Sequence, residues 1–176
     1  MTAMALAQFS TINFECYDGG TDRLVGLTSV ELPELSLKTT EIAGAGILGD
    51  YDAPLRGHME NLQVTLNFRV LFENATRFLN QSAQNLTLRA ANETYDSGTG
   101  QRKASALTIV LRGLTQSCKL GEIKSGESSE TAVVINVAYL KIEQDGKELY
   151  EFDRFNYIYN VSGVDFLTDV RDALGL

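Results

Sequence analysis

Histidine, cysteine and long apolar runs are scarce in this chain of 176 residues, and each shortage excludes a class of protein. His58 is the only histidine, so neither a multi-histidine metal site nor a pair of catalytic imidazoles is available. We interpret it as a loop histidine without a special role. Cys16 and Cys118 lack CxxC spacing and a disulfide-rich context, which indicates two reduced thiols buried as small hydrophobic groups.

No segment approaches the ~18 consecutive apolar residues that a membrane-spanning helix needs, so we expect no membrane anchor. The first residues, MTAMALAQF, lack the charged beginning and full apolar run of a secretion signal. We therefore expect the chain to stay in the cytosol of the cell that makes it. With 44% hydrophobic residues, the chain is long enough for one core, and we expect a single domain over residues 1–176.

Basic residues are in the minority, with 15 Lys and Arg against 23 Asp and Glu, a formal net charge of −8. This balance argues against a groove that grips nucleic acid through its phosphates. The charge is unevenly distributed: −6 over residues 1–60, +4 over residues 61–119 and −6 over residues 120–176. A basic middle between acidic flanks would let copies attract one another head to tail, although scattered solvated charge explains it equally well.

Alternating apolar and polar residues predict strands along most of the chain. The clearest case is LQVTLNFRV, whose core face would carry Leu62, Val64, Leu66, Phe68 and Val70. Further strands are expected over residues 86–95, 104–117 and 131–144, with a polar loop over residues 121–130.

Two hairpins are expected from their turn residues. Residues 139–159 read as two strands joined at the Asp-Gly pair 145–146, which suits the positive φ angles of a two-residue turn. Apolar residues lie on both faces of this hairpin, so a further layer or another molecule must cover the second face. An earlier hairpin would turn at residues 18–20 and return over residues 24–32. Its first strand would present Ile12, Phe14 and Cys16 on one face.

Two short helices accompany the strands. LFENATRFLNQ predicts a helix over the mouth of a barrel or sandwich, with one apolar side of Leu71, Phe72, Phe78 and Leu79. At the C-terminal end, Ser162 stands three residues before Asp165, the spacing of a capping box. The helix after it would bury Val164, Leu167, Val170 and Leu174. The fold class is therefore mainly β: an antiparallel barrel or sandwich with long hairpins and one or two short helices, including a C-terminal helix.

Candidate chemistry is sparse. GAGILGD, residues 44–50, looks like a glycine-rich phosphate loop but lacks the GK[ST] ending and has its third glycine one position late. Glu148, Glu151 and Asp153 lie around a hairpin strand, where paired carboxylates sometimes act as acid and base. Such residues are more typical of solvated strand edges. We predict no catalytic residue, no metal site and no cofactor.

Three segments carry a resemblance to a known family. LPELSLKTTEIAGAGILGDYDAPLRGHMENLQVTL, the strand LTIVLRG and YLKIEQDGKELYEFDRFNYIYNVSGVDFLTDVRDALGL follow an N-terminal hairpin in this order. The chain resembles the major tail tube protein of phages with contractile tails, and the tube of headless contractile bacteriocins. The most specific pieces are GAG at residues 44–46, DGKEL at 145–149 and the ending NVSGVDFLTDVRDALGL. The Asn-rich stretch over residues 74–100 has no counterpart by motif.

The resemblance implies a non-enzymatic structural protein. Six copies would form a ring through joined sheets, and rings would stack into a hollow tube inside a contractile sheath. The implied partners are further copies, the sheath protein, the baseplate or tail-tip initiator and the tail terminator. The location would be a virion tail or a released tail-like particle, assembled in the bacterial host cytoplasm. The tube would conduct DNA or puncture the target envelope.

The resemblance also explains the two-faced hairpin, because one face would line the channel or meet a neighbouring copy. The candidates for the channel wall are Glu143, Glu148, Glu151 and Asp153, which would repel DNA phosphates.

Residues 43–59 form a long segment without periodicity, which is uncommon in a compact domain unless it is functional. We predict an arm to an adjacent subunit or the next ring, with a lid on its own barrel as the alternative. The glycines at 44, 46 and 49 would permit its backbone path. The residues expected to make the contact are Gly44, Gly46, Ile47, Leu48, Tyr51 and Leu55.

Two other classes remain open. A monomeric calycin-like β-barrel that binds a ligand would account for the strands but gives no role to the arm. A small β-sandwich hydrolase would need a nucleophile beside His58, the only imidazole base.

Overall fold

Antiparallel strands make up most of the structure, a computed structural model that describes residues 6–19 and 22–176, with side chains from residue 8 onward. The first strands are β1 (Leu6–Asp18), β2 (Asp22–Arg23), β3 (Leu27–Glu31), β4 (Leu37–Ile42), β5 (Tyr51–Met59) and β6 (Leu62–Phe68). They are followed by β7 (Gln84–Asp96), β8 (Gln101–Lys119), β9 (Thr131–Gln144), β10 (Lys147–Asp153), β11 (Ile158–Val161) and β12 (Val164–Asp165). The helices are α1 (Glu73–Thr76), the 3-10 turn η1 (Arg77–Leu79) and α2 (Thr168–Leu174).

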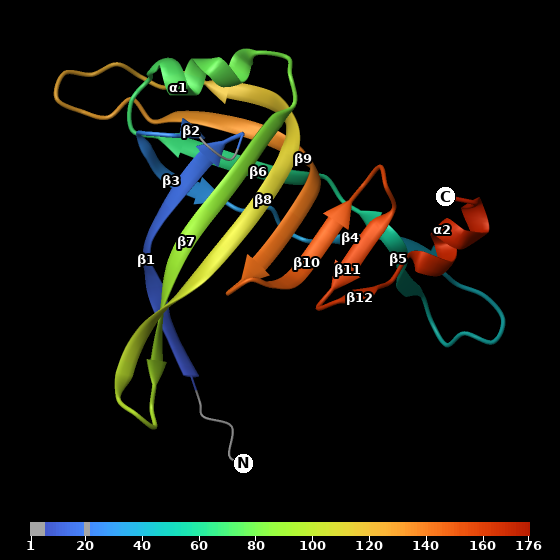
Figure 1. The fold of residues 1–176 in the computed structure, drawn as a ribbon. Coiled ribbons are helices and arrows are strands. Elements are labelled where there is room, and N and C mark those ends of the chain that lie inside the picture. The colour runs from blue at the N-terminus through green and yellow to red at the C-terminus, as the bar shows by residue number, and fades with distance from the viewer. Residues whose placement is uncertain (1–5, 20–21) are drawn as a thin grey trace.

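One sheet of ten strands organises the molecule, and β9 is its branch point (Figure 1). One edge of β9 pairs with β8 along almost its whole length. The other edge pairs with β6 over residues 131–137 and then with β10 over residues 139–144. The sheet runs in the order β12-β11-β10-β9-β8-β7-β1-β2, with β6 and β3 attached beside it. The mainly β, antiparallel prediction is confirmed.

The sheet is not closed into a barrel, which corrects part of the predicted architecture. The early hairpin explains why. β2 pairs with β1 at only two positions, and β3 then pairs with β6 instead of returning along β1. Between them Leu24 turns into the core, where it is 4% exposed. A strand within the predicted range 24–32 exists as β3, but its predicted return along β1 is wrong. Residue 20 of the predicted turn lies outside the described residues.

The core lies between the β6 side and the β7–β8 side of the curved sheet. On β6 the alternation is confirmed, because Leu62, Val64, Leu66 and Phe68 are buried. Val70 is exposed, since the strand ends at Phe68.

The helix predicted within residues 71–81 exists as α1 and η1, which cover the upper end of the sheet in Figure 1. Its inward residues are Ala75 and Phe78, and the Phe78 ring lies 6.3 Å from that of Phe68. Leu71, Phe72 and Leu79 are exposed, against the prediction. The 3.6-residue period fails because a single α-helical turn passes directly into a 3-10 turn with three residues per turn.

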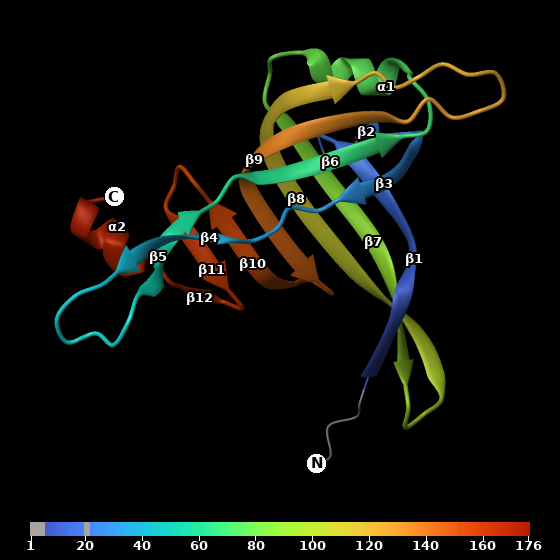
Figure 2. The same cartoon turned by 180° about the vertical axis from the view of Figure 1, so that it is seen from behind.

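The predicted strands over residues 86–95 and 104–117 are confirmed and are longer than expected. With β1 they form a ladder that extends well below the rest of the sheet (Figures 1 and 2). The hairpin of residues 139–159 is also confirmed, with φ of 50° at Asp145 and 79° at Gly146. The Asp145 carboxylate accepts hydrogen bonds from Ser105 Oγ and the Ala106 amide, both at 2.8 Å, which fixes the turn to β8.

The capping box predicted at Ser162 is wrong, although the C-terminal helix is confirmed. Ser162 and Gly163 have φ of 53° and 84° and form the turn between β11 and β12. The helix begins only at Thr168, so the Asp165 carboxylate instead accepts a hydrogen bond from the Leu167 amide at 2.9 Å. Leu167 is the buried residue here, Val170 is partly buried, and Val164 and Leu174 are exposed.

Candidate assembly surfaces

The segment predicted as an arm is a β-hairpin that stands away from the main sheet (Figure 2). We call residues 37–59 the arm and residues 43–50 its tip. β4 and β5 form a separate two-stranded sheet, so the prediction of a long segment without secondary structure holds only for the tip. Four pairs join the strands, from Thr39 with Pro54 to Ile42 with Tyr51.

The tip and the strand residues beside it present apolar side chains to solvent. Leu48 is fully exposed, Ile47 and Tyr51 are 43% and 59% exposed, and Leu55 is 36% exposed. Gly44, Gly46 and Gly49 all have positive φ, as their predicted role in the backbone path requires. Ile42, 40% exposed, belongs to the same apolar set and was missed because it precedes the glycines.

A bulge bends the arm at its root. Between the Leu37–Met59 and Thr39–Pro54 pairs, β4 has one residue, whereas β5 has the four residues 55–58. Gly57 lies in this bulge with φ of 75°, and a Cβ there would come within 2.9 Å of Leu167 Cδ2. Any other residue would have to adopt a backbone conformation that favours glycine and would push the Leu167 side chain aside.

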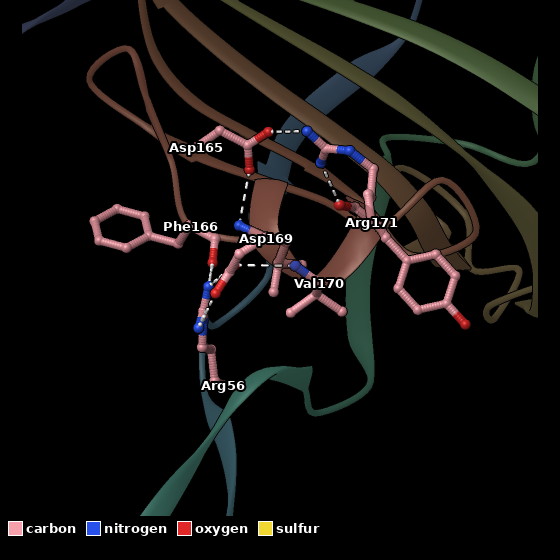
Figure 3. A network of polar contacts seen from close by, with 8 residues as sticks. Arg56, Asp165, Phe166, Asp169, Val170 and Arg171 are labelled. Carbon is pink, nitrogen blue, oxygen red and sulfur yellow. Dashed lines mark hydrogen bonds and ion pairs between the residues drawn. The ribbon is translucent and has the colours of Figure 1, made fainter. Parts of the chain in front are cut away.

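Arg56 joins the root to the C-terminal helix (Figure 3). Its Nε donates to the Phe166 carbonyl at 2.8 Å, and its Nη1 donates to the Asp169 carboxylate at 3.0 Å. The Arg56 guanidinium holds the pKa of Asp169 below its usual range. A second pair, Asp165 with Arg171, braces the helix from its other side. We call these contacts the clasp.

Arg171 has two partners in the clasp: it donates to the Asp165 carboxylate and, through Nη1, to the Tyr157 carbonyl at 2.7 Å. The hydrogen bond from Arg171 lowers the pKa of Asp165, and the bond from the Leu167 amide adds to the effect. Through Arg56 and Asp169, the clasp also joins residues that are 113 positions apart in sequence. No sequence motif marks this clasp.

A cavity of about 300 Å³ lies beside the clasp, between the arm root, the β10–β11 turn and α2. Its apolar lining includes Met59, Phe152, Leu167 and Val170. Its rim carries the cationic or titratable side chains of Lys38, Arg56, His58 and Arg154. His58 therefore lies at the rim of a cavity in the arm root, a position that was not predicted from the sequence.

The four predicted channel residues lie along β9 and β10, each with a polar partner. Lys141 Nζ lies 2.9 Å from Glu143 and 3.2 Å from Glu148. Glu151 accepts a 2.7 Å hydrogen bond from Tyr139 Oη. Burial and that bond raise the pKa of Tyr139 to about 12. Asp153 instead accepts from the amides of residues 155 and 156, both at 3.0 Å, which makes it a turn residue.

Cations missed from the sequence share this face. Residues directly opposite on neighbouring strands point to the same side of a sheet, which places Arg112 beside Tyr139 and Lys141 beside Glu151. The Arg112 guanidinium lies 4.8 Å from the centre of the Tyr139 ring. This face of the sheet therefore carries both positive and negative side chains.

The outer edge of β1 is the longest bare edge in the described part of the chain. Its other edge pairs with β7 from Leu6 to Asp18, whereas β2 covers only its last two residues. Phe9 and Ile12, at 55% and 59% exposed, lie on this strand. A long edge strand with exposed apolar residues favours pairing with another chain.

Neither a metal site nor a membrane helix is found among the residues that the structure describes. No group of three or more His, Cys, Asp and Glu is placed to hold a metal ion there. No helix in that part is long and apolar enough to cross a membrane. Cys16 and Cys118 are free thiols, and burial raises the pKa of Cys16 to about 12.

The clasp predicts a pH dependence of the C-terminal helix. The pKa of Asp165 lies below its ordinary 3.8 in the folded chain, so its pairing contributes stability above pH 3.8 that is lost as the pH falls through the lowered pKa. Carboxyl NMR titration should therefore give a pKa below 3.8 for Asp165, rising toward 3.8 in Arg171→Gln. Arg56→Gln is the control, since it should move Asp169 and leave Asp165 unchanged. An Asp165 pKa that is the same with and without Arg171 would refute the pairing.

Comparison with known proteins identifies the family. The family model for phage tail tube protein FII matches residues 10–175. The tail tube protein of Escherichia phage P2 is 30% identical over 155 residues, covering 84% of this chain and 86% of the phage protein. The major tail tube protein of Serratia phage KSP20 is 28% identical over 164 residues, covering 93% of this chain and 94% of that protein. With a match along nearly its whole length, the chain belongs to the phage tail tube protein FII family.

Proposed function

We propose that this chain builds the inner tube of a contractile phage tail or phage-tail-like particle, as rings of six copies stacked into a hollow tube. Membership of the family makes it a structural tail tube protein, which assembles with itself and with other tail components. The single observation that carries the proposal is the open sheet with the bare β1 edge. Joining this edge to a neighbouring copy in a closed ring would remove the bare β1 edge.

The proposal extends to the other predicted properties. The whole chain, residues 1–176, acts as one tail-tube domain without catalytic activity or cofactor. The sheath surrounds the tube, a baseplate or tail-tip initiator starts it and a terminator ends it, with assembly in the bacterial host cytoplasm. A monomeric ligand-binding barrel is not favoured, because the sheet is open and the arm is exposed.

The faces of the β9–β10 hairpin have different roles in this arrangement. Tyr150 and Phe152 turn inward, where both ring centres lie within 6.3 Å of that of Tyr159. The opposite face, with Glu143, Glu148 and Glu151, then lines the channel. Asp153 belongs at the margin of this face, since its carboxylate is committed to a turn.

Purified protein is expected to form rings or tubes, because the open edges of one copy find partners only in another. Sedimentation and negative-stain microscopy of concentrated protein, with and without a tail-tip initiator, would test this. A chain that stays strictly monomeric at millimolar concentration, even with the initiator, would count against the proposed function.

Replacing residues 47–51 by a Gly-Ser linker should abolish tubes while leaving the fold intact. These residues are exposed, and surface substitutions usually change the free energy of unfolding by less than about 0.5 kcal/mol. The circular dichroism spectrum and melting transition should be retained. Ile47→Val with Leu48→Met keeps the tip apolar and should still assemble. Unfolding of the linker variant would support a lid, and normal assembly would refute the arm.

Reversing Glu143, Glu148 and Glu151 to Lys should slow DNA release from a genome-carrying particle, because phosphates would be attracted to the wall. Ejection kinetics would measure the effect. The matched control reverses Glu122, Glu127 and Glu130, which changes the net charge equally on an exposed loop. Equal release rates in the wild type and both variants would refute the channel assignment.

A further inference from the structure

The arm is electrically polarised along its length. From residue 39 to 55 it contains three acidic residues, Glu41, Asp50 and Asp52, and no Lys or Arg. The root carries Lys38 and Arg56 instead, together with His58. The three carboxylates are exposed, and none has an ion pair or side-chain hydrogen bond among the described residues.

The tip and the strand ends beside it carry these carboxylates next to the exposed apolar side chains. Glu41 is paired with Asp52 across the strands, next to the Ile42–Tyr51 pair. Leu48, fully exposed, lies in the loop beyond them. Two like charges directly opposite on neighbouring strands are destabilising, so a cationic partner would relieve a repulsion already present in the arm.

The cavity beside the clasp has the complementary composition. Its floor is apolar, and Met59, Phe152 and Leu167 are each at most 5% exposed. Its one carboxylate, Asp153, is occupied by backbone amides. At the rim, Lys38 and His58 have no polar side-chain partner within the described chain.

The other two cations at the rim are fixed by the fold. Arg154 donates to the carbonyls of Met59, at 3.3 Å, and Glu60, at 2.7 Å. Arg56 is held by Asp169 and the Phe166 carbonyl in the clasp. Because the partners of Arg154 are uncharged carbonyls and Lys38 has no carboxylate partner, these two side chains carry unneutralised positive charge beside the apolar lining.

The tip cannot reach the cavity of its own chain. Four paired residues separate the tip from the bulge, a length of roughly 13 Å at about 3.3 Å per residue. The paired strands hold the tip away from the root, and both ribbon views show it projecting outward (Figures 1 and 2). A tip that enters this cavity must therefore come from another copy of the chain.

We propose that the arm tip of one copy docks into the cavity at the arm root of a neighbouring copy. This rests on the proposed function and names the acceptor for its arm. Leu48 and its apolar neighbours lie against the floor, and the carboxylates meet Lys38 and the other cations at the rim. Since tip and cavity are different surfaces, the contact is head to tail, and each copy both donates a tip and receives one. Two acidic tips repel each other, which disfavours tip-to-tip pairing.

Cross-linking locates the contact. In assembled particles, Leu48→Cys combined with Lys38→Cys should form disulfide-linked multimers under mild oxidation. The control combines Leu48→Cys with Ile123→Cys, an exposed position in the loop between β8 and β9. Leu48→Cys alone measures the background from the native Cys16 and Cys118. Multimers in the control but not in the Lys38 combination would overturn the docking.

Charge exchange tests the pairing itself. The tip-reversed variant, Asp50→Lys with Asp52→Lys, and the root-reversed variant, Lys38→Glu with His58→Glu, change only exposed side chains. Each alone should need at least about tenfold more protein to assemble, which corresponds to about 1.4 kcal/mol. An equal mixture should assemble near the wild-type concentration, because each tip then meets an oppositely charged root. Circular dichroism and melting would check that both variants fold.

The outcomes separate the docking from the proposed function. If the wild type forms no rings or tubes, the tube proposal itself fails. If the wild type assembles and both reversed variants assemble at the same concentration, only the docking fails. If the variants are impaired and the mixture does not recover, the tip and the root do not contact each other, and the docking fails as well.

Discussion

The hydrogen bonding of β9 determines the rest of the structure. One edge of this strand is shared with β8, whereas the other is divided between β6 and β10. A strand has only two edges, so this division forces the sheet to branch. One branch curls over the core through β6 and β3, and the other leads through β10 and β11 to the clasp. The openness of the sheet follows, because neither branch returns to β1.

Local sequence signals predicted the elements that local interactions determine. The alternation in residues 62–68 and the Asp-Gly turn at 145–146 gave the correct strands and hairpin, because side-chain period and turn conformation are set by near neighbours. The apolar residues on both faces of that hairpin also have a structural explanation. A bulge between Glu148 and Tyr150 shifts the alternation, so Leu149 and Tyr150 need not lie on opposite sides of a regular strand.

The errors arose where a distant contact competes with a local signal. Ser162 and Asp165 have the spacing of a capping box, yet Gly163 after Ser162 allows a turn that pairs β12 with β11. Residues 51–59 show no alternation, yet they form a strand because β4 provides a partner. In the candidate site, the exposed tip was recognisable from its glycines and apolar residues. The clasp could not be recognised from the sequence, because Arg56 and Asp169 are separated by 113 positions.

The bulge at Gly57 has a consequence for exchanging parts between related tubes. The backbone of this glycine and the side chain of Leu167 occupy adjoining space, and Arg56 is paired with a carboxylate on the C-terminal helix. If the hairpin of a relative replaced the arm, its bulge would have a different geometry and would not fit the C-terminal helix of this chain. The arm and the C-terminal helix therefore form one transferable unit, despite lying in separate halves of the chain.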